Sequence, residues 1–305
     1  MSYTVEPVIK NSCSSIGEGP HWDAASQSLF YVDIKRGDVH KWNSLTKEDS
    51  KMHFDYPTVS IIVPCAEGGY VIGTTHSLSH LETWGSEKLT VWAEMEQGMP
   101  TQINDGKCDA RGRLWSGTMG KELSPGIVAP ELGALYSLDT KRILKKHVDK
   151  INISNGMDWT SDNKTMFFID STVRKVYAFD YDLESGSLSN QRTAVDFGEG
   201  TEPQLGLPDG MTMDTENKIW IACYNAGKVV CFDSETGKLL REVKIPASRT
   251  TSVAWGGANL DDLYVTSCRH GFSEEQLQTT EALSGSVFKI TGLGAKGRQA
   301  NNFQG

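Results

Sequence analysis

Four oxygen-bearing side chains stand immediately before glycines, or one residue earlier, at wide intervals along the chain. Glu18, Asn155 and Asp209 each precede a glycine, and Asn104 precedes Asp-Gly. Asn-Gly and Asp-Gly are ordinary turn signals, but glycine also permits a close approach of the backbone to a ligand. Two carboxylates and two amide oxygens form a set of hard ligands, which suits Ca²⁺, Mg²⁺ or Mn²⁺ better than a metal that prefers thiolates.

These four residues occupy equivalent positions in four units of a repeat. Each lies ten or eleven residues before a short run of apolar and aromatic residues, and two further runs of the same kind complete the series. The six runs cover 29–33, 70–73, 114–117, 166–170, 219–222 and 263–266, and their first residues are 41 to 53 positions apart. Short β-branched and aromatic runs bounded by Gly, Asn, Asp and Ser are typical of strands.

Six units of about 50 residues predict an all-β fold, a six-bladed β-propeller with a central-channel metal site, in a single domain spanning 1–305. A large β-sandwich is the alternative, but sandwiches show turns every 8–12 residues without a longer period. Four tryptophans at equivalent places are interpreted as core between the blades: Trp22, Trp115, Trp159 and Trp220. Ser273 to Gln276 resembles a capping box and predicts a short helix within the last blade.

In a propeller, the strand before each run is the innermost one and lines the channel. Equivalent positions on innermost strands point towards a common axis, so Glu18, Asn104, Asn155 and Asp209 are expected to converge although they span nearly 200 residues. We interpret this convergence as a binding site for a cation.

Composition excludes several classes of protein. The chain has 305 residues and a formal net charge of −9, which argues against a nucleic-acid partner. No apolar run approaches the roughly 20 residues that span a bilayer, and the first residues lack the features of a signal peptide. The six cysteines are scattered without a C-x-x-C pair, so we expect free thiols and a cytoplasmic location.

At these residues the chain resembles the regucalcin, gluconolactonase and luciferin-regenerating-enzyme family, also called senescence marker protein, and is closest to its animal regucalcin-like members. The resemblance runs over most of the chain. It is carried by Gly17-Glu18-Gly19-Pro20-His21-Trp22, Asn104-Asp105-Gly106-Lys107, Gly117-Thr118-Met119, Ile153-Ser154-Asn155-Gly156, Phe179-Asp180-Tyr181-Asp182, Pro208-Asp209-Gly210-Met211 and Ile290-Thr291-Gly292-Leu293-Gly294.

The resemblance implies a divalent-metal-dependent lactonase that hydrolyses a sugar lactone, such as glucono-1,5-lactone, or a related lactone or ester by metal-activated water. The family's metal ligands match Glu18, Asn155 and Asp209, and its substrate contacts match Asn104 and Glu122. Asp209 is expected to act as the catalytic base, because it is a carboxylate beside the metal. Sugar lactonases of the family carry Arg where this chain has Gln102, and Gln lacks both the charge and the bidentate fork of Arg.

Other functions remain open on this sequence. The same site suits a calcium-binding regulatory protein with little or no turnover, or a luciferin-regenerating type of protein, and a propeller can also be a scaffold for protein partners. We expect one bound metal ion, Ca²⁺ first and Mg²⁺, Mn²⁺ or Zn²⁺ otherwise. The expected partner is a small lactone or ester, with no nucleic acid or membrane, on a monomer or weak dimer.

Overall fold

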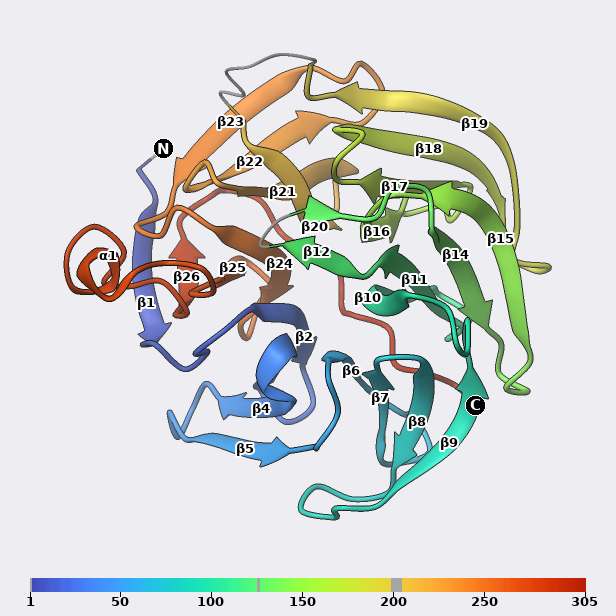
Figure 1. Ribbon diagram of the computed structural model, residues 1–305. Coiled ribbons are helices and arrows are strands. Elements are labelled where there is room, and N and C mark those ends of the chain that lie inside the picture. Colours follow the sequence, from blue (N-terminus) through green and yellow to red (C-terminus); the bar gives the residue numbers. More distant parts are fainter. Residues whose placement is uncertain (1, 125–126, 199–204) are drawn as a thin grey trace.

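Six four-stranded antiparallel sheets are arranged as blades around a central channel (Figure 1). The structure is a computed structural model that describes residues 2–124, 127–198 and 205–305. The arrangement confirms the six-bladed propeller that the repeat predicts.

The first three blades follow one another along the chain, and each begins with its innermost strand. Blade 1 contains β2 (Gly17–Asp23), β3 (Ser28–Asp33), β4 (Asp38–Asn43) and β5 (Asp49–His53), with the 3-10 helix η1 (Ile34–Arg36) between β3 and β4. Blade 2 contains β6 (Val59–Pro64), β7 (Tyr70–Thr74), β8 (Ser77–Leu81) and β9 (Leu89–Glu94). Blade 3 contains β10 (Thr101–Cys108), β11 (Leu114–Gly120), β14 (Gly133–Leu138) and β15 (Leu144–Ile151), with a small hairpin of β12 (Glu122–Ser124) and β13 (Ile127–Val128) between β11 and β14.

The last three blades repeat the plan, and the sixth closes the ring. Blade 4 contains β16 (Ser154–Trp159), β17 (Thr165–Asp170), β18 (Lys175–Asp182) and β19 (Ser187–Asp196). Blade 5 contains β20 (Leu207–Met213), β21 (Lys218–Tyr224), β22 (Lys228–Asp233) and β23 (Leu239–Lys244). Blade 6 contains β24 (Thr250–Gly256), β25 (Asp262–Ser267), β26 (Val287–Thr291) and β1 (Thr4–Ile9), so the first strand of the chain pairs with the last.

The six apolar runs form the second strand of each blade, as predicted. The capping box also forms as predicted: helix α1 (Glu274–Gln278) lies between β25 and β26, and the Ser273 side chain accepts a hydrogen bond from the backbone N–H of Gln276. Within the described parts of the chain, no helix is long and apolar enough to cross a membrane.

The hydrophobic core lies between neighbouring blades. One cluster combines Trp220 of blade 5 with Trp255 of blade 6, whose rings meet edge to face at a centroid distance of 5.4 Å. Trp22 of blade 1 stacks on Tyr264 of blade 6 at 5.2 Å, which ties the first blade to the last. The four tryptophans predicted as inter-blade core are all buried.

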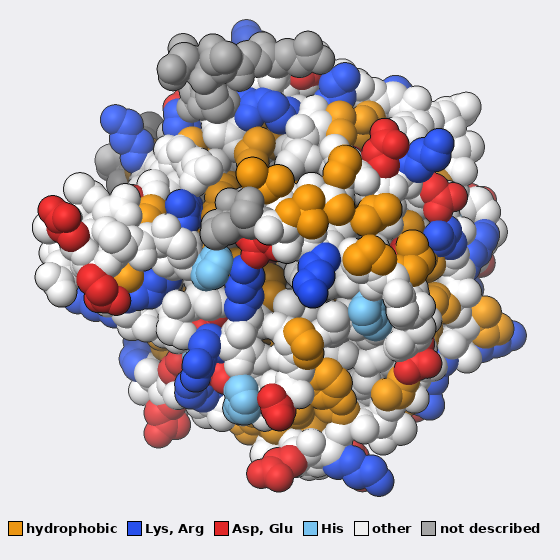
Figure 2. Space-filling model, viewed as in Figure 1, with side chains coloured by type: hydrophobic (Ala, Val, Ile, Leu, Met, Phe, Trp, Pro, Cys, Tyr) orange, Lys and Arg blue, Asp and Glu red, His pale blue; other side chains and the backbone are white. Residues whose placement is uncertain are grey.

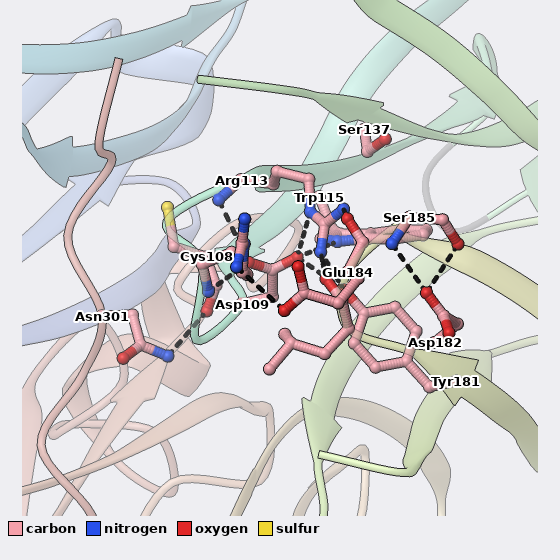
Figure 3. A network of polar contacts seen from close by, with 12 residues as sticks. Cys108, Asp109, Arg113, Trp115, Ser137, Tyr181, Asp182, Glu184, Ser185 and Asn301 are labelled. Carbon is pink, nitrogen blue, oxygen red and sulfur yellow. Dashed lines mark hydrogen bonds and ion pairs between the residues drawn. The ribbon is translucent and has the colours of Figure 1, made fainter.

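A buried polar network around an ion pair of blade 3 connects blade 3 to blade 4 (Figure 3). The fully buried Asp109, in the turn between β10 and β11, accepts hydrogen bonds from Arg113 Nε at 2.8 Å, Trp115 Nε1 at 3.0 Å and Tyr181 Oη at 2.6 Å. Blade 5 contains a similar interaction, in which Asp214 accepts a hydrogen bond from Trp220 Nε1 at 2.9 Å. In both blades, an aspartate in the turn between the first and second strands therefore accepts a hydrogen bond from the tryptophan six positions later.

The last residues of the chain cross one end of the channel. The backbone N–H of Phe303 donates to Pro64 of blade 2, that of Gln304 donates to Gly112 of blade 3, and Asn302 Oδ1 lies 3.2 Å from His21 Nε2 of blade 1. Gly112 belongs to a turn between first and second strands, so this segment covers that end of the channel. The connections between second and third strands lie at the other end and surround the site.

Candidate active site

The uncovered end of the channel opens into a cavity of about 250 Å³. All six residues singled out from the sequence line it, and they come from five strands of four blades: Glu18, Gln102, Asn104, Glu122, Asn155 and Asp209. Figure 2 shows this face, with Lys or Arg side chains and a histidine gathered near its middle. The structure thus brings the predicted residues together, and their roles stay predictions.

Irregular pairing in the innermost strands turns the key side chains towards the cavity. All six innermost strands lose register against their second strands at one point. Asn104, Asn155 and Asp209 lie within these irregularities, and Glu18 borders the one in β2. A β-bulge leaves a residue outside the regular ladder and changes where its side chain points, so the bulges position the set.

Two of the glycines after these residues do not form the turns that their dipeptides suggest. Gly156 and Gly210 lie inside strands with ordinary backbone angles, whereas Gly19 has a positive φ of 56°. A Cβ atom on Gly156 would lie 2.8 Å from the backbone oxygen of Asp209 and closer still to the backbone nitrogen of Met211. A Cβ atom on Gly210 would overlap the side chain of Ser252. Glycine is needed here because the innermost strands of adjacent blades almost touch.

Replacing Gly156 by Ala is therefore expected to damage both stability and the site. The methyl group must push β16 away from β20, and overpacking of this kind costs roughly 2 kcal/mol. Because Asn155 and Asp209 lie on these two strands, we also expect metal affinity to fall at least tenfold. Denaturant unfolding and calorimetric metal titration measure the two effects.

The matched control for this substitution is Gly85→Ala. Gly85 has a positive φ of 98° but no atom within 4 Å of its potential Cβ atom, so it reports backbone strain without crowding. We expect this control to leave metal affinity unchanged. Equal effects of the two substitutions on metal binding would contradict the crowding argument.

The amide of Asn155 is oriented by its neighbour. Asn155 Nδ2 donates to Ser171 Oγ at 3.0 Å, while Asn155 Oδ1 is buried and has no hydrogen-bond donor among the described residues. A buried acceptor without a partner is unfavourable by about 1–3 kcal/mol. The oxygen therefore lies in a position that a cation would satisfy.

Two carboxylates share the floor of the cavity with this amide. Glu18 and Asp209 are each only 8% exposed. Burial raises the pKa of Glu18 well above its usual range, and the nearby charges of Asp209 and Asp105 raise it further. Burial and the charge of Asp105 likewise raise the pKa of Asp209. Both shifts have the sign expected for carboxylates that lack a positive counter-charge.

The donor set fits a hard divalent cation. Glu18, Asn155 and Asp209 offer oxygen atoms only, which is the preference of Ca²⁺ and Mg²⁺, and bound positive charge would reverse the unfavourable burial of both acids. No group of three or more His, Cys, Asp or Glu side chains that could hold a metal occurs within the described residues. The set therefore depends on an amide ligand and on water or substrate to complete the coordination.

The predicted substrate contacts surround this floor. Asn104 is oriented like Asn155, because its Nδ2 donates to the backbone oxygen of Ser154 at 2.9 Å. Gln102 lies two residues earlier on the same strand. Glu122, on the β12–β13 hairpin, forms an ion pair with Lys35 of η1, so its carboxylate already holds one cation at the mouth.

Polar residues of the cavity that were not predicted from the sequence include Lys35, Ser171, Arg249 and His270. Each follows an apolar strand or lies in a connection, at positions where polar residues are ordinary. Ser171 directly follows β17, and no spacing in the sequence distinguishes it. Only the positions of the connections around the mouth identify these residues.

Comparison with known proteins agrees with this fold. Residues 16–269 match the family described as the SMP-30/Gluconolactonase/LRE-like region. Regucalcin of Danio rerio is 40% identical over 304 residues, which cover 100% of this chain and 99% of that protein. A luciferin-regenerating enzyme superposes with a TM-score of 0.89 at 34% identity, covering 99% of this chain and 100% of the other. A calcium-binding protein, regucalcin, from Agrobacterium tumefaciens shares the fold with a TM-score of 0.89 at 23% identity, covering 99% and 98% of the two chains.

Proposed function

The chain belongs to the SMP-30/gluconolactonase/LRE-like family, and from this premise we propose that it hydrolyses a lactone or related ester with one divalent metal ion. Glu18, Asn155 and Asp209 would hold the ion. Ca²⁺ is the first candidate, and Mg²⁺, Mn²⁺ and Zn²⁺ are the alternatives that the experiment below separates.

One observation carries this proposal. An unpartnered amide oxygen and two buried acids meet at the floor of a cavity that is large enough for a small ring. Around them lie further polar side chains that an ion buffer does not need, Gln102 and Asn104 among them. A metal site with these polar side chains beside it suits a substrate better than an ion alone.

The reaction consumes one water molecule. The water oxygen forms a bond to the carbonyl carbon, the ring C–O bond breaks, and the ring oxygen takes a proton to become a hydroxyl. The product is a hydroxy carboxylate, and one proton is released at neutral pH. A bound divalent cation supplies Lewis acidity towards the carbonyl oxygen and acidifies water.

Side chains of the protein have the other roles in the reaction. Asp209 accepts the proton of the attacking water as the general base. Asn104, held by the backbone of Ser154, donates or accepts hydrogen bonds with substrate hydroxyl groups. Gln102 and Glu122 contact the edge of the substrate nearest the mouth.

The test is hydrolysis of a panel of lactones, including glucono-1,5-lactone, by chelated protein with Ca²⁺, Mg²⁺, Mn²⁺ or Zn²⁺ restored one at a time. We expect acid release to return with at least one ion and to stay absent in the chelated sample. Metal binding without turnover of any lactone or ester would contradict the enzyme proposal.

Replacing Gln102 by Arg is expected to raise kcat/KM for glucono-1,5-lactone by roughly tenfold or more. Arg presents a charged planar fork to substrate oxygens, which Gln cannot do. Gln102→Lys is the matched control, because it adds the charge without the fork, and we expect a smaller gain. Steady-state acid release measures both variants, and an unchanged kcat/KM in Gln102→Arg would show that this position does not contact the sugar.

A second candidate function is calcium-binding regulation with little turnover. The observation that favours it is the ion pair of Glu122 with Lys35, because a carboxylate expected to contact substrate is already engaged. This candidate predicts tight Ca²⁺ binding in the same assay and no acid release with any ion.

The proposal extends to location and assembly. Six buried free cysteines are compatible with a reducing compartment, and we propose a cytoplasmic protein. A small lactone or ester is the proposed partner, on a monomer or weak dimer that sedimentation measures directly.

A further inference from the structure

The mouth of the cavity carries two basic side chains from opposite ends of the chain. Lys35 comes from η1 of blade 1, and Arg249 directly precedes β24 of blade 6. Both line the cavity whose floor holds Glu18 and Asp209. The cavity is therefore acidic at its floor and basic at its rim.

Arg249 is held firmly. Its guanidinium lies over the ring of Phe272 at 3.9 Å and near that of Tyr224 at 5.8 Å. Nε donates to Asn225 Oδ1 at 3.2 Å, and Nη1 donates to the backbone oxygen of His270. These contacts fix the plane of the group before any ligand arrives, which lowers the entropy lost on binding.

The hydrogen-bond acceptors of Arg249 are neutral oxygens. Within residues 2–124, 127–198 and 205–305, no carboxylate forms an ion pair with it. Lys35 differs, because its ammonium group pairs with Glu122 and lies 3.0 Å from His270 Nε2. Of these two basic side chains at the rim, Arg249 is thus the one without a carboxylate partner in the described part of the chain.

The pKa of His270 depends on the charges around it at the rim. Burial lowers its pKa, and the positive charges of Lys35 and Arg249 lower it further against the opposing effect of Glu122. The imidazole is therefore neutral near pH 7 and accepts a hydrogen bond from Lys35. It adds no charge to the rim.

Among the described charged side chains that line the cavity, one positive charge then remains. A divalent ion balances Glu18 and Asp209, and Lys35 balances Glu122. We propose that the substrate is an anionic lactone or ester, whose carboxylate or similar small acidic group binds Arg249 while its carbonyl group faces the floor. This inference rests on the proposed hydrolase function and names its substrate class.

Apolar side chains also line the cavity, and they include Ile16, Ile34, Ile153 and Leu207. These side chains offer no hydrogen-bond partner to hydroxyl groups, and they favour a compact ring with one charged substituent.

Two matched pairs of lactones test this inference. D-glucaro-1,4-lactone and D-glucono-1,4-lactone differ by a carboxylate in place of a hydroxymethyl group. A smaller pair, 5-oxotetrahydrofuran-2-carboxylate and its 2-hydroxymethyl analogue, makes the same exchange without sugar hydroxyls. With the metal that restores activity, we expect kcat/KM to be 10- to 100-fold higher for the carboxylate of each pair, and this preference to shrink at high salt.

Variants assign the preference to one side chain. Arg249→Gln is expected to abolish the preference, so that within this variant the carboxylate and the neutral member of each pair have kcat/KM values within about twofold of each other. Arg249→Lys keeps the charge and is expected to retain part of the preference, which distinguishes a charge effect from misfolding. Arg192→Gln, in an exposed ion pair on blade 4, is the control for the loss of one positive charge and is expected to behave like the parent.

The outcomes separate this inference from the proposed function. Hydrolysis of both members without preference, or a preference that survives in Arg249→Gln, overturns the substrate class and leaves the hydrolase intact. If no lactone is hydrolysed, the hydrolase proposal fails, and calorimetry on the protein in saturating Ca²⁺ decides the inference. Binding of the carboxylate probes alone, lost in Arg249→Gln, then supports an anion site, and equal or absent binding overturns it.

Discussion

Asp209→Asn is expected to reduce metal-dependent lactone hydrolysis by at least about a thousandfold. The substitution keeps the shape of the side chain but removes the proposed general base, which contributes roughly 10²–10⁴ to rate. It also removes one of two carboxylates that would hold the ion. Acid release at saturating metal measures the loss, and Asp149→Asn is the control, because Asp149 is an exposed acid outside the cavity. Activity near that of the parent protein would contradict the assignment of Asp209.

The same variant has an opposite effect on the metal-free protein. Because the pKa values of Asp209 and Glu18 are raised in the folded state, their contribution to stability is complete below the unfolded pKa of about 4. That contribution is lost as pH rises through the folded values. Metal-free Asp209→Asn is thus expected to be at least as stable as the metal-free parent protein at pH 7. Added Ca²⁺ should raise Tm in the parent far more than in the variant, and an equal rise in both would place the ion elsewhere.

Asp109→Ala is expected to lower the free energy of unfolding by roughly 3–5 kcal/mol. Asp109 is fully buried, and its removal leaves the Arg113 guanidinium, whose side chain is 9% exposed, without its carboxylate. The donors of Trp115 and Tyr181 lose an acceptor as well. Urea unfolding monitored by tryptophan fluorescence measures the change.

Two comparisons sharpen this test. Asp180→Ala removes an acid from an exposed ion pair with Arg192, and we expect no measurable change in stability there. Asp109→Ala combined with Arg113→Met removes both buried charges and is expected to recover part of the loss, because an unpaired buried charge is worse than none. A double variant no more stable than Asp109→Ala would show that the hydrogen bonds of Trp115 and Tyr181 dominate.

Much of the fold follows from local chemistry. The apolar runs, such as 29–33 and 219–222, become second strands because each is buried between two neighbouring blades. The capping box at Ser273 starts α1 because its two hydrogen bonds join residues three positions apart. Such features depend on neighbours in sequence, and inspection of the sequence suffices to find them.

The candidate site was also predictable in part. Equivalent positions in four of the repeats are occupied by Glu18, Asn104, Asn155 and Asp209. Because the innermost strands form a ring, side chains at equivalent positions point towards the same axis. The reason for their glycines was not predictable, because the crowding at Gly156 comes from β20, more than fifty residues later. The pairing of Glu122 with Lys35 was hidden for the same reason, since 87 residues separate them.

The sequence alone determined the strands, the number of blades and the oxygen-rich set at the channel, because periodicity and residue type encode them. Tertiary structure alone decided which amide oxygen lacks a partner and which acids are buried together. It also decided which basic side chain at the mouth has no carboxylate partner among the described residues. Hydrogen-bond satisfaction and electrostatic balance depend on distances between blades, and those distances arise only when the ring closes through β1 and β26.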